Sequence, residues 1–171
     1  MNRKFFLASI SFFIFFLACA VWAGSEGKAP AFTLKDASGK VYSLAQYKDK
    51  NAVLMTFWAS WCQPCVLEMP MIEKTYQKFR KDGLEVLSIN VDTASGVAKA
   101  QQIVQRKAVT FPVLYDADSK AAGLYNPKGW YPFTLLVDKA GDIVYTHQGF
   151  NPGDEKELET EIGKALGLPK P

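Results

Sequence analysis

Two cysteines separated by two residues, Cys62 and Cys65, follow an apolar run from Ala52 to Phe57. The run has the length and residue types of a buried strand, and the residues after Cys62 have helical spacing. The sequence therefore predicts a strand, a tight turn and a helix that begins at the first cysteine. This feature constrains the fold most, because it fixes two sulfur atoms at the carboxyl end of a central strand, where open α/β sheets place their sites.

This spacing favours thiol–disulfide exchange. A thiolate is the species that attacks a disulfide, and a helix N-terminus favours an anion because its first N–H groups lack partners. We expect Cys62 to lie there, exposed, as the attacking nucleophile. Cys65 comes one turn later on the same helix face, where it can resolve a mixed disulfide. Pro64 suits the first helical turn, where its missing N–H costs nothing.

Two static alternatives compete with redox chemistry. A structural zinc site would need two further Cys or His ligands, and outside the N-terminal segment only His147 remains. A permanent disulfide closing so small a loop would remove little entropy from the unfolded chain. We therefore expect a redox-active disulfide, no metal and no other cofactor. His147 ends a predicted strand, and we interpret it as structural.

The N-terminus has the pattern of a secretory signal. Arg3 and Lys4 precede a nearly unbroken apolar run from Phe5 to Ala23, and Val21-Trp22-Ala23 offers a cleavage site before Gly24. The run is also just long enough to span a bilayer as an uncleaved anchor. A third alternative is lipidation, because Cys19 weakly resembles the modified cysteine of a bacterial lipoprotein.

In each case residues 24–171 are exported, and residues 1–23 are a signal peptide or membrane anchor. This predicts a location in a bacterial periplasm or on the outer face of the cytoplasmic membrane, with the N-terminal segment as the sole membrane contact. Residues 24–171 hold 18 basic and 17 acidic residues, a net charge of about +1, and nothing in them suggests nucleic acid binding. Their number suits one domain with a full hydrophobic core.

Strand and helix patterns alternate along these residues. The expected strands are 31–34, 41–44, 51–59, 84–91, 111–115, 133–138 and 142–147, and the expected helices are 62–81, 95–106, 119–125 and 158–166. Strands that alternate with helices, followed by a late hairpin and a closing helix, imply an α/β fold with a mixed central sheet and helices on both faces.

Several motifs carry a family resemblance. They are Ala29-Pro30-Ala31-Phe32-Thr33-Leu34, Phe57-Trp58-Ala59-Ser60-Trp61-Cys62-Gln63-Pro64-Cys65, Glu68-Met69-Pro70, Ser88-Ile89-Asn90-Val91-Asp92, Phe111-Pro112-Val113 and Pro132-Phe133-Thr134-Leu135-Leu136-Val137-Asp138. In these motifs the chain resembles thioredoxin-fold proteins of the exported TlpA/ResA/CcmG-like branch. The resemblance implies a thioredoxin-like domain with an N-terminal β-hairpin and a helix/strand insertion between Asp92 and Tyr115.

The resemblance also assigns site residues. Pro132 matches the family's cis-proline, which faces the disulfide and presents backbone to the substrate. Glu68 matches a carboxyl that affects thiol titration and proton transfer, although a solvated helix Glu is the plainer interpretation of that residue alone. The chain departs from thioredoxin at Thr56, where thioredoxin has a buried acid.

The same resemblance implies a substrate-binding surface around the disulfide. We expect it to comprise Trp61, Gln63, Pro64, Tyr131 and Pro132. Trp61 would form an apolar lip that docks partner protein, although plain packing would also explain it. Tyr131 is bulkier than the Val or Thr usual before this proline, which alters the expected shape of the groove.

Family members usually reduce disulfides of exported proteins, often apocytochrome c, with electrons from a membrane carrier of the DsbD/CcdA kind. Gln63 and Pro64 carry no positive charge, so we expect a potential nearer thioredoxin at ~−270 mV than DsbA at ~−120 mV. A thiol oxidase or isomerase is the main alternative. A peroxiredoxin is disfavoured because Met55 and Ala59 replace the Pro and Thr of its motif. A Sco-type copper chaperone would need one more residue between the cysteines.

Overall fold

The computed structural model describes residues 27–169. The segment 1–23, with Cys19, lies outside the described residues. The strands are β1 Thr33–Asp36, β2 Val41–Ser43, β3 Ala52–Trp58, β4 Leu84–Asn90, β5 Val113–Tyr115, β6 Phe133–Val137 and β7 Ile143–Gln148. The helices are α1 Gln63–Phe79, α2 Val97–Lys107, α3 Lys120–Tyr125 and α4 Glu155–Leu166, with short 3-10 turns η1 Leu44–Gln46 and η2 Arg80–Asp82.

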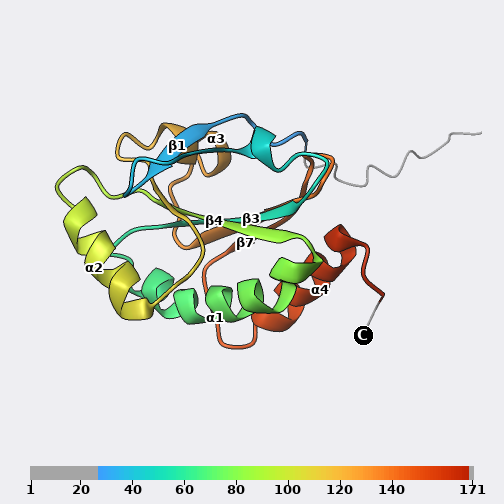
Figure 1. Ribbon diagram of the computed structural model, residues 1–171. Helices are drawn as coiled ribbons and strands as arrows, with labels where there is room; N and C mark the ends of the chain where they lie inside the picture. Colours follow the sequence, from blue (N-terminus) through green and yellow to red (C-terminus); the bar gives the residue numbers. More distant parts are fainter. Residues whose placement is uncertain (1–26, 170–171) are drawn as a thin grey trace, which may run out of the picture.

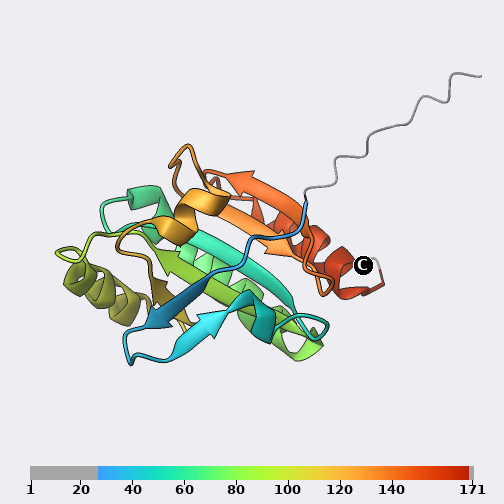
Figure 2. The same ribbon diagram turned by 90° about the horizontal axis from the view of Figure 1, so that it is seen from above.

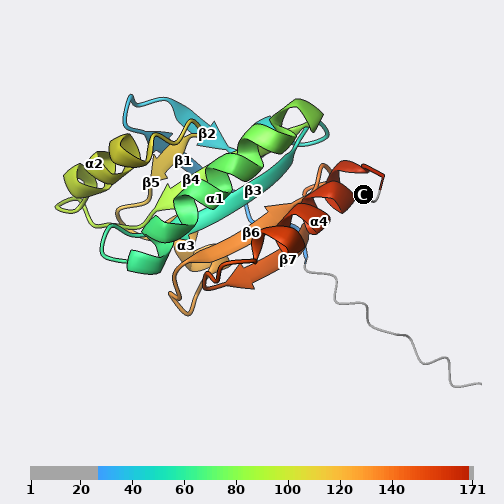
Figure 3. The same ribbon diagram turned by 90° about the horizontal axis from the view of Figure 1, so that it is seen from below.

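The strands form one mixed sheet in the order β2-β1-β5-β4-β3-β6-β7. The central pairs β3/β4 and β4/β5 are parallel, and the outer pairs are antiparallel. One face is covered by α1, α2 and α4 and the other by α3 (Figures 1 and 3). The expected α/β, thioredoxin-like fold with helices on both faces is confirmed.

The core is centred on β3. All seven of its residues are buried, as befits a strand with helices on both sides and strands on both edges. Its neighbour β4 is buried except at half-exposed Glu85. These two strands end side by side, with Trp58 paired to Asn90, so whatever follows β3 lies next to whatever follows β4. That edge of the sheet is where the two cysteines come.

The predicted insertion contains α2 and β5, and β5 pairs with both β4 and β1. The hairpin of β1 and β2 therefore extends the sheet beyond β5, as Figure 2 shows from above. Within the described residues, 27–169, no helix has the length and apolar character needed to cross a membrane.

Several helix boundaries differ from prediction. The final helix begins at Glu155 and not at 158. The helix expected over 95–106 begins at Val97, because the Ser95 hydroxyl is bonded to Thr93 at 3.0 Å and does not cap the helix. The long helix ends at Phe79 and tightens into η2 before Gly83. Gly83 has φ +101°, the left-handed conformation expected of the residue that closes a helix.

Candidate active site

The two predicted cysteines form a disulfide where β3 gives way to α1. The Cys62–Cys65 sulfurs are 2.05 Å apart, and their Cα atoms are separated by 5.3 Å. A tight turn after Trp58 delivers the first cysteine, whose N–H donates to the Ala59 carbonyl at 3.0 Å. The strand, turn and helix expected from the sequence are therefore present, with the disulfide at the carboxyl edge of the sheet.

Cys62 is the N-cap residue of α1. Its backbone is extended, with φ −89° and ψ 96°, and its sulfur accepts a hydrogen bond from the Cys65 N–H at 3.3 Å. A sulfur in this position gains from both the unpaired amides and the positive end of the helix dipole. Reduction of the disulfide would therefore leave negative charge preferentially on Cys62.

Burial distinguishes the two sulfurs but corrects one expectation. Cys62 is only 6% exposed and Cys65 is 1% exposed, so the first cysteine is the more accessible without being openly exposed. The reason is local: Cys62 packs into the hydrophobic core cluster together with Ala59 and Cys65. A substrate must therefore approach along the rim of the site to reach Cys62.

The turn before Cys62 is held by Asp92, a residue for which the sequence suggested no role. The buried Asp92 carboxyl group accepts hydrogen bonds from the Ser60 N–H at 2.8 Å and the Ser60 hydroxyl at 3.1 Å. Asn90 donates to the same carboxyl group at 2.8 Å. The signals in the sequence were an acidic residue just past the end of an apolar strand and its place at the end of a family motif.

Glu68 lies on α1 one turn beyond Cys65 and is 5% exposed. Burial raises the pKa of this carboxyl group to about 8, a hydrogen bond from the Thr134 hydroxyl opposes that rise, and the charge of Asp154 adds to it. Glu68 and Cys65 border the same small cavity. The arrangement can exchange a proton between a buried carboxyl group and the resolving cysteine.

The rim of the site is aromatic. Trp61 is 65% exposed, and its ring meets the ring of half-buried Tyr131 edge-on, with centroids 5.9 Å apart. The Tyr131–Pro132 peptide bond is cis, as predicted. Because Phe133 pairs with Phe57, Pro132 falls beside the end of β3, on the disulfide side of the sheet. The structure therefore brings Trp61, Tyr131 and Pro132 to one edge of the site.

The other expected surface residues also lie there. Gln63 and Pro64 are exposed on the first turn of α1. The Pro132 carbonyl accepts a hydrogen bond from the Gly149 N–H at 2.9 Å, which ties the loop at Pro132 to the residue after β7. Trp130, which is half exposed and lies under the Lys128 ammonium at 4.8 Å, extends the aromatic surface by one residue.

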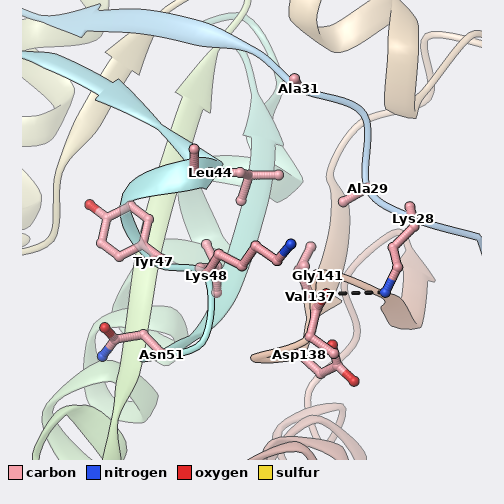
Figure 4. A pocket seen from close by; sticks show the side chains of 13 residues that line it. Lys28, Ala29, Ala31, Leu44, Tyr47, Lys48, Asn51, Val137, Asp138 and Gly141 are labelled. Carbon is pink, nitrogen blue, oxygen red and sulfur yellow. Dashed lines mark hydrogen bonds between the residues drawn. The ribbon is translucent and has the colours of Figure 1, made fainter.

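A separate pocket of about 210 Å³ lies at the opposite end of β3 (Figure 4). Lys28 closes one side of it by donating to the Ala140 carbonyl at 3.1 Å and pairing with Asp142 at 2.8 Å. It holds neither cysteine. Among residues 27–169, no three His, Cys, Asp or Glu side chains are grouped so that they could hold a metal ion.

Comparison with known proteins shows the family to which the chain belongs. Residues 26–146 match the model of the AhpC/TSA family. The thiol-disulfide oxidoreductase ResA of Geobacillus kaustophilus is 35% identical over 142 residues, which are 83% of this chain and 78% of that protein. ResA of Bacillus subtilis is 34% identical and covers 73% of this chain and 70% of its own. The chain belongs to the ResA-like thiol–disulfide oxidoreductases.

Solved structures agree with this membership. A putative thiol:disulfide interchange protein DsbE from Chlorobium tepidum is 31% identical, with a TM-score of 0.76 over 84% of this chain and 98% of that one. A putative thioredoxin from Neisseria meningitidis is 31% identical, with a TM-score of 0.72 over 83% and 91%. In this family setting, the Cys62–Cys65 disulfide is the redox centre of a thiol–disulfide oxidoreductase.

The role of Asp92 can be tested by substitution. Asp92→Ala leaves the Ser60 N–H and the Asn90 amide without their buried acceptor, so we expect the free energy of unfolding to fall by about 2 kcal/mol. Exchange with a small disulfide should slow as the turn loosens. Asp92→Asn retains one acceptor and should lose less. Urea unfolding checks the first effect, and an unchanged midpoint for Asp92→Ala would contradict it.

The buried Glu68 predicts a pH-dependent stability. Its pKa is higher in the folded protein than in the unfolded chain, so folding takes up a proton between about pH 4.5 and 8. The free energy of unfolding should therefore fall as pH rises through this window. Glu68→Gln has no such proton uptake. Between pH 5 and pH 8 its free energy of unfolding should therefore rise, relative to that of wild type, by on the order of 3 kcal/mol.

Urea unfolding of the oxidised proteins at several pH values measures this difference. Glu157→Gln, an exposed position on α4, is the matched control and should follow wild type at every pH. If wild type and Glu68→Gln showed the same pH dependence, the buried carboxyl group would not be the source.

Proposed function

We propose that this protein reduces disulfides of exported proteins through Cys62 and Cys65. The observation that supports this most is the helix amide that donates to the sulfur of Cys62, above a second sulfur one turn along the same helix. A thiolate at Cys62 attacks the substrate disulfide, forms a mixed disulfide and expels one substrate thiolate. Cys65 then attacks the Cys62 sulfur and expels the second.

The electrons and the proton that move in this cycle can each be assigned to a group of the enzyme. Two electrons pass from the dithiol to the substrate as the Cys62–Cys65 bond forms. Cys65 must lose its proton before it attacks, and Glu68 is the carboxyl group that shares a cavity with it. Reduction of the disulfide by an electron donor reverses the transfer, since Glu68 can return a proton to Cys65.

The rim residues supply the binding surface in this proposal. A substrate that presents an apolar stretch beside its disulfide would rest on Trp61 and Tyr131, whose rings are in contact. Gln63 and Pro64 are exposed next to Cys62, and the cis bond at Pro132 sets the adjoining loop. The bulk of Tyr131 selects against substrates that need a deep groove.

The setting we propose is extracytoplasmic. The apolar run from Phe5 to Ala23 supports export, with the run as either a cleaved signal or an anchor. The ResA relatives are bacterial proteins, which supports a bacterial location. A reductant in an oxidising compartment needs electrons from elsewhere, and a membrane thiol carrier of the DsbD/CcdA kind would supply them. Apocytochrome c is the substrate we propose first.

The direction of exchange follows from the redox potential. No positive charge lies between the cysteines at Gln63 and Pro64, so the reduced form lacks the extra stabilisation that makes a strong oxidant. We expect a potential nearer ~−270 mV than ~−120 mV. Equilibration with glutathione or dithiothreitol measures it. A value above about −180 mV would assign the protein to the oxidases or isomerases instead.

A trapping experiment tests the two sulfur roles. Cys65→Ala leaves Cys62 without a resolving partner, so exported proteins should accumulate as mixed disulfides with Cys62 that mass spectrometry identifies. Cys62→Ala is the matched control and should trap little, because Cys65 is almost completely buried. If Cys62→Ala trapped partners as well as Cys65→Ala, the assignment of attacker and resolver would be wrong.

A further inference from the structure

Glu68 poses a problem of access. Each exchange moves a proton on or off a carboxyl group that is 5% exposed, on a helix face turned toward the sheet. Because burial keeps a proton on Glu68 at neutral pH, the exchange chemistry proposed above requires that this proton reach solvent before Glu68 can accept one from Cys65. The Thr134 hydroxyl joins Glu68 to β6, so the proton has a second possible path besides the substrate side.

The sheet beneath Glu68 carries one row of polar side chains. Ser88 on β4 is paired with Thr56 on β3, Thr56 is paired with Thr134 on β6, and Thr134 is paired with His147 on β7. Residues directly opposite each other in a sheet point to the same face. The row therefore crosses four neighbouring strands on the face that α1 and α4 cover (Figure 3).

The outer half of this row connects Glu68 to the surface. The Thr134 hydroxyl donates to Glu68 Oε1 at 3.3 Å. His147 Nε2 lies 3.1 Å from Asp154 Oδ2, and the two side chains are 24% and 21% exposed. Glu68, Thr134, His147 and Asp154 all border one cavity of about 10 Å³, close to the room that a single water molecule needs.

The inner half connects Glu68 to the resolving cysteine. A second cavity of about 10 Å³ is bordered by Cys65, Glu68, Thr56 and Ser88. The Thr56 hydroxyl donates to the Ser88 hydroxyl at 3.3 Å. The indole Nε1 of Trp58, which also borders this cavity, is buried without a hydrogen-bond partner among the described residues. Glu68 is thus the residue that the two cavities share.

We propose that Thr134, His147 and Asp154 form the route by which protons pass between Glu68 and solvent. His147 is the proton-exchanging group at the surface, because one nitrogen of an imidazole ring can accept a proton while the other donates one, and its side chain is 24% exposed. Asp154 is a positioning residue that orients the ring, and it is itself held by the Asn151 N–H at 2.6 Å. His147, interpreted from the sequence as structural, gains a role in the reaction.

Among residues 27–169, the other titratable groups that face Glu68 are less suited to this role. Those that face Glu68 are Cys65 from its own helix, Tyr145 and His147 from β7, and Asp154 from the segment before α4. The strands β3, β4 and β6 offer no carboxyl or imidazole group there, only the hydroxyl groups of Thr56, Ser88 and Thr134 and the indole of Trp58. Burial raises the pKa of Tyr145 to about 12, so its phenol stays protonated at neutral pH.

The proposed route acts in the resolving step. Burial keeps a proton on Glu68 at neutral pH, so Glu68 first releases it by way of Thr134 and a water-sized site to His147 and on to solvent. Cys65 then gives its proton to the Glu68 carboxylate, and its thiolate attacks the Cys62 sulfur, forms the Cys62–Cys65 bond and expels the substrate thiolate. The two electrons go to the substrate, and Glu68 ends the step protonated, as it began.

The test is single-turnover oxidation of the reduced, folded protein by 5,5′-dithiobis(2-nitrobenzoate) in weak buffer. Two thiolates are released, the first by attack of Cys62 and the second by attack of Cys65. In His147→Gln, which can keep a hydrogen bond to Asp154, we expect the first release to be unchanged and the second to slow about tenfold. Met71→Leu, in the wall of the same cavity, is the matched control and should behave as wild type.

Two further measurements separate proton transfer from a structural effect. Added imidazole should restore the second release in His147→Ala and leave Met71→Leu unaffected. In a Glu68→Gln background, His147→Gln should add no further slowing, since the route then has no inner end. Wild type that released no thiolate would refute the exchange chemistry itself. Active wild type, with His147→Gln releasing both thiolates at the wild-type rates, would overturn the route alone.

Discussion

The amide of Cys65 donates to the sulfur of Cys62 at 3.3 Å, and this contact joins the fold to its chemistry. It exists because β3 ends where α1 begins, so that the first free N–H groups of the helix meet the first cysteine. The disulfide can be reversible without a metal or an organic cofactor, since the helix supplies the stabilisation that the thiolate needs. The rest of the structure holds this junction in place.

Two elements far away in the sequence support the junction. Parallel pairing of β3 with β4 sets Asp92 beside Ser60 and fixes the turn. Packing of α1 across β6 sets Glu68 against Thr134 and keeps the carboxyl group out of water. Both interactions give a buried polar group a hydrogen-bond partner. Such partnered groups make the site rigid, and Glu68 can still exchange a proton.

The local parts of this site could be predicted from the sequence. The strand, the turn and the helix around Cys62 follow from residue periodicity, and the cis bond before Pro132 followed from the family motif. The hydrogen bonds from Ser60 to Asp92 could not be predicted, because they depend on the register of β3 and β4. The same is true of His147, which meets the surroundings of Glu68 through its pairing with Thr134.

Two other wrong predictions, a helix start and the exposure of a cysteine, had a similar origin. Ser95 had the residue type of a helix cap, but its hydroxyl bonds to Thr93, so the helix begins later. Cys62 was expected to be exposed as the attacking nucleophile, whereas it packs against core residues and is only 6% exposed. In both cases a contact with a neighbouring residue, which the sequence pattern does not reveal, decided where the helix begins or how far the side chain is buried.

The most direct test of the central claim is the order in which the two thiols react. A short pulse of iodoacetamide on the reduced, folded protein, repeated from acid to alkaline pH and followed by peptide mass spectrometry, gives the alkylation rate of each cysteine. The account predicts that Cys62 is modified first and at lower pH, while Cys65 stays protected. Equal rates, or faster modification of Cys65, would contradict it.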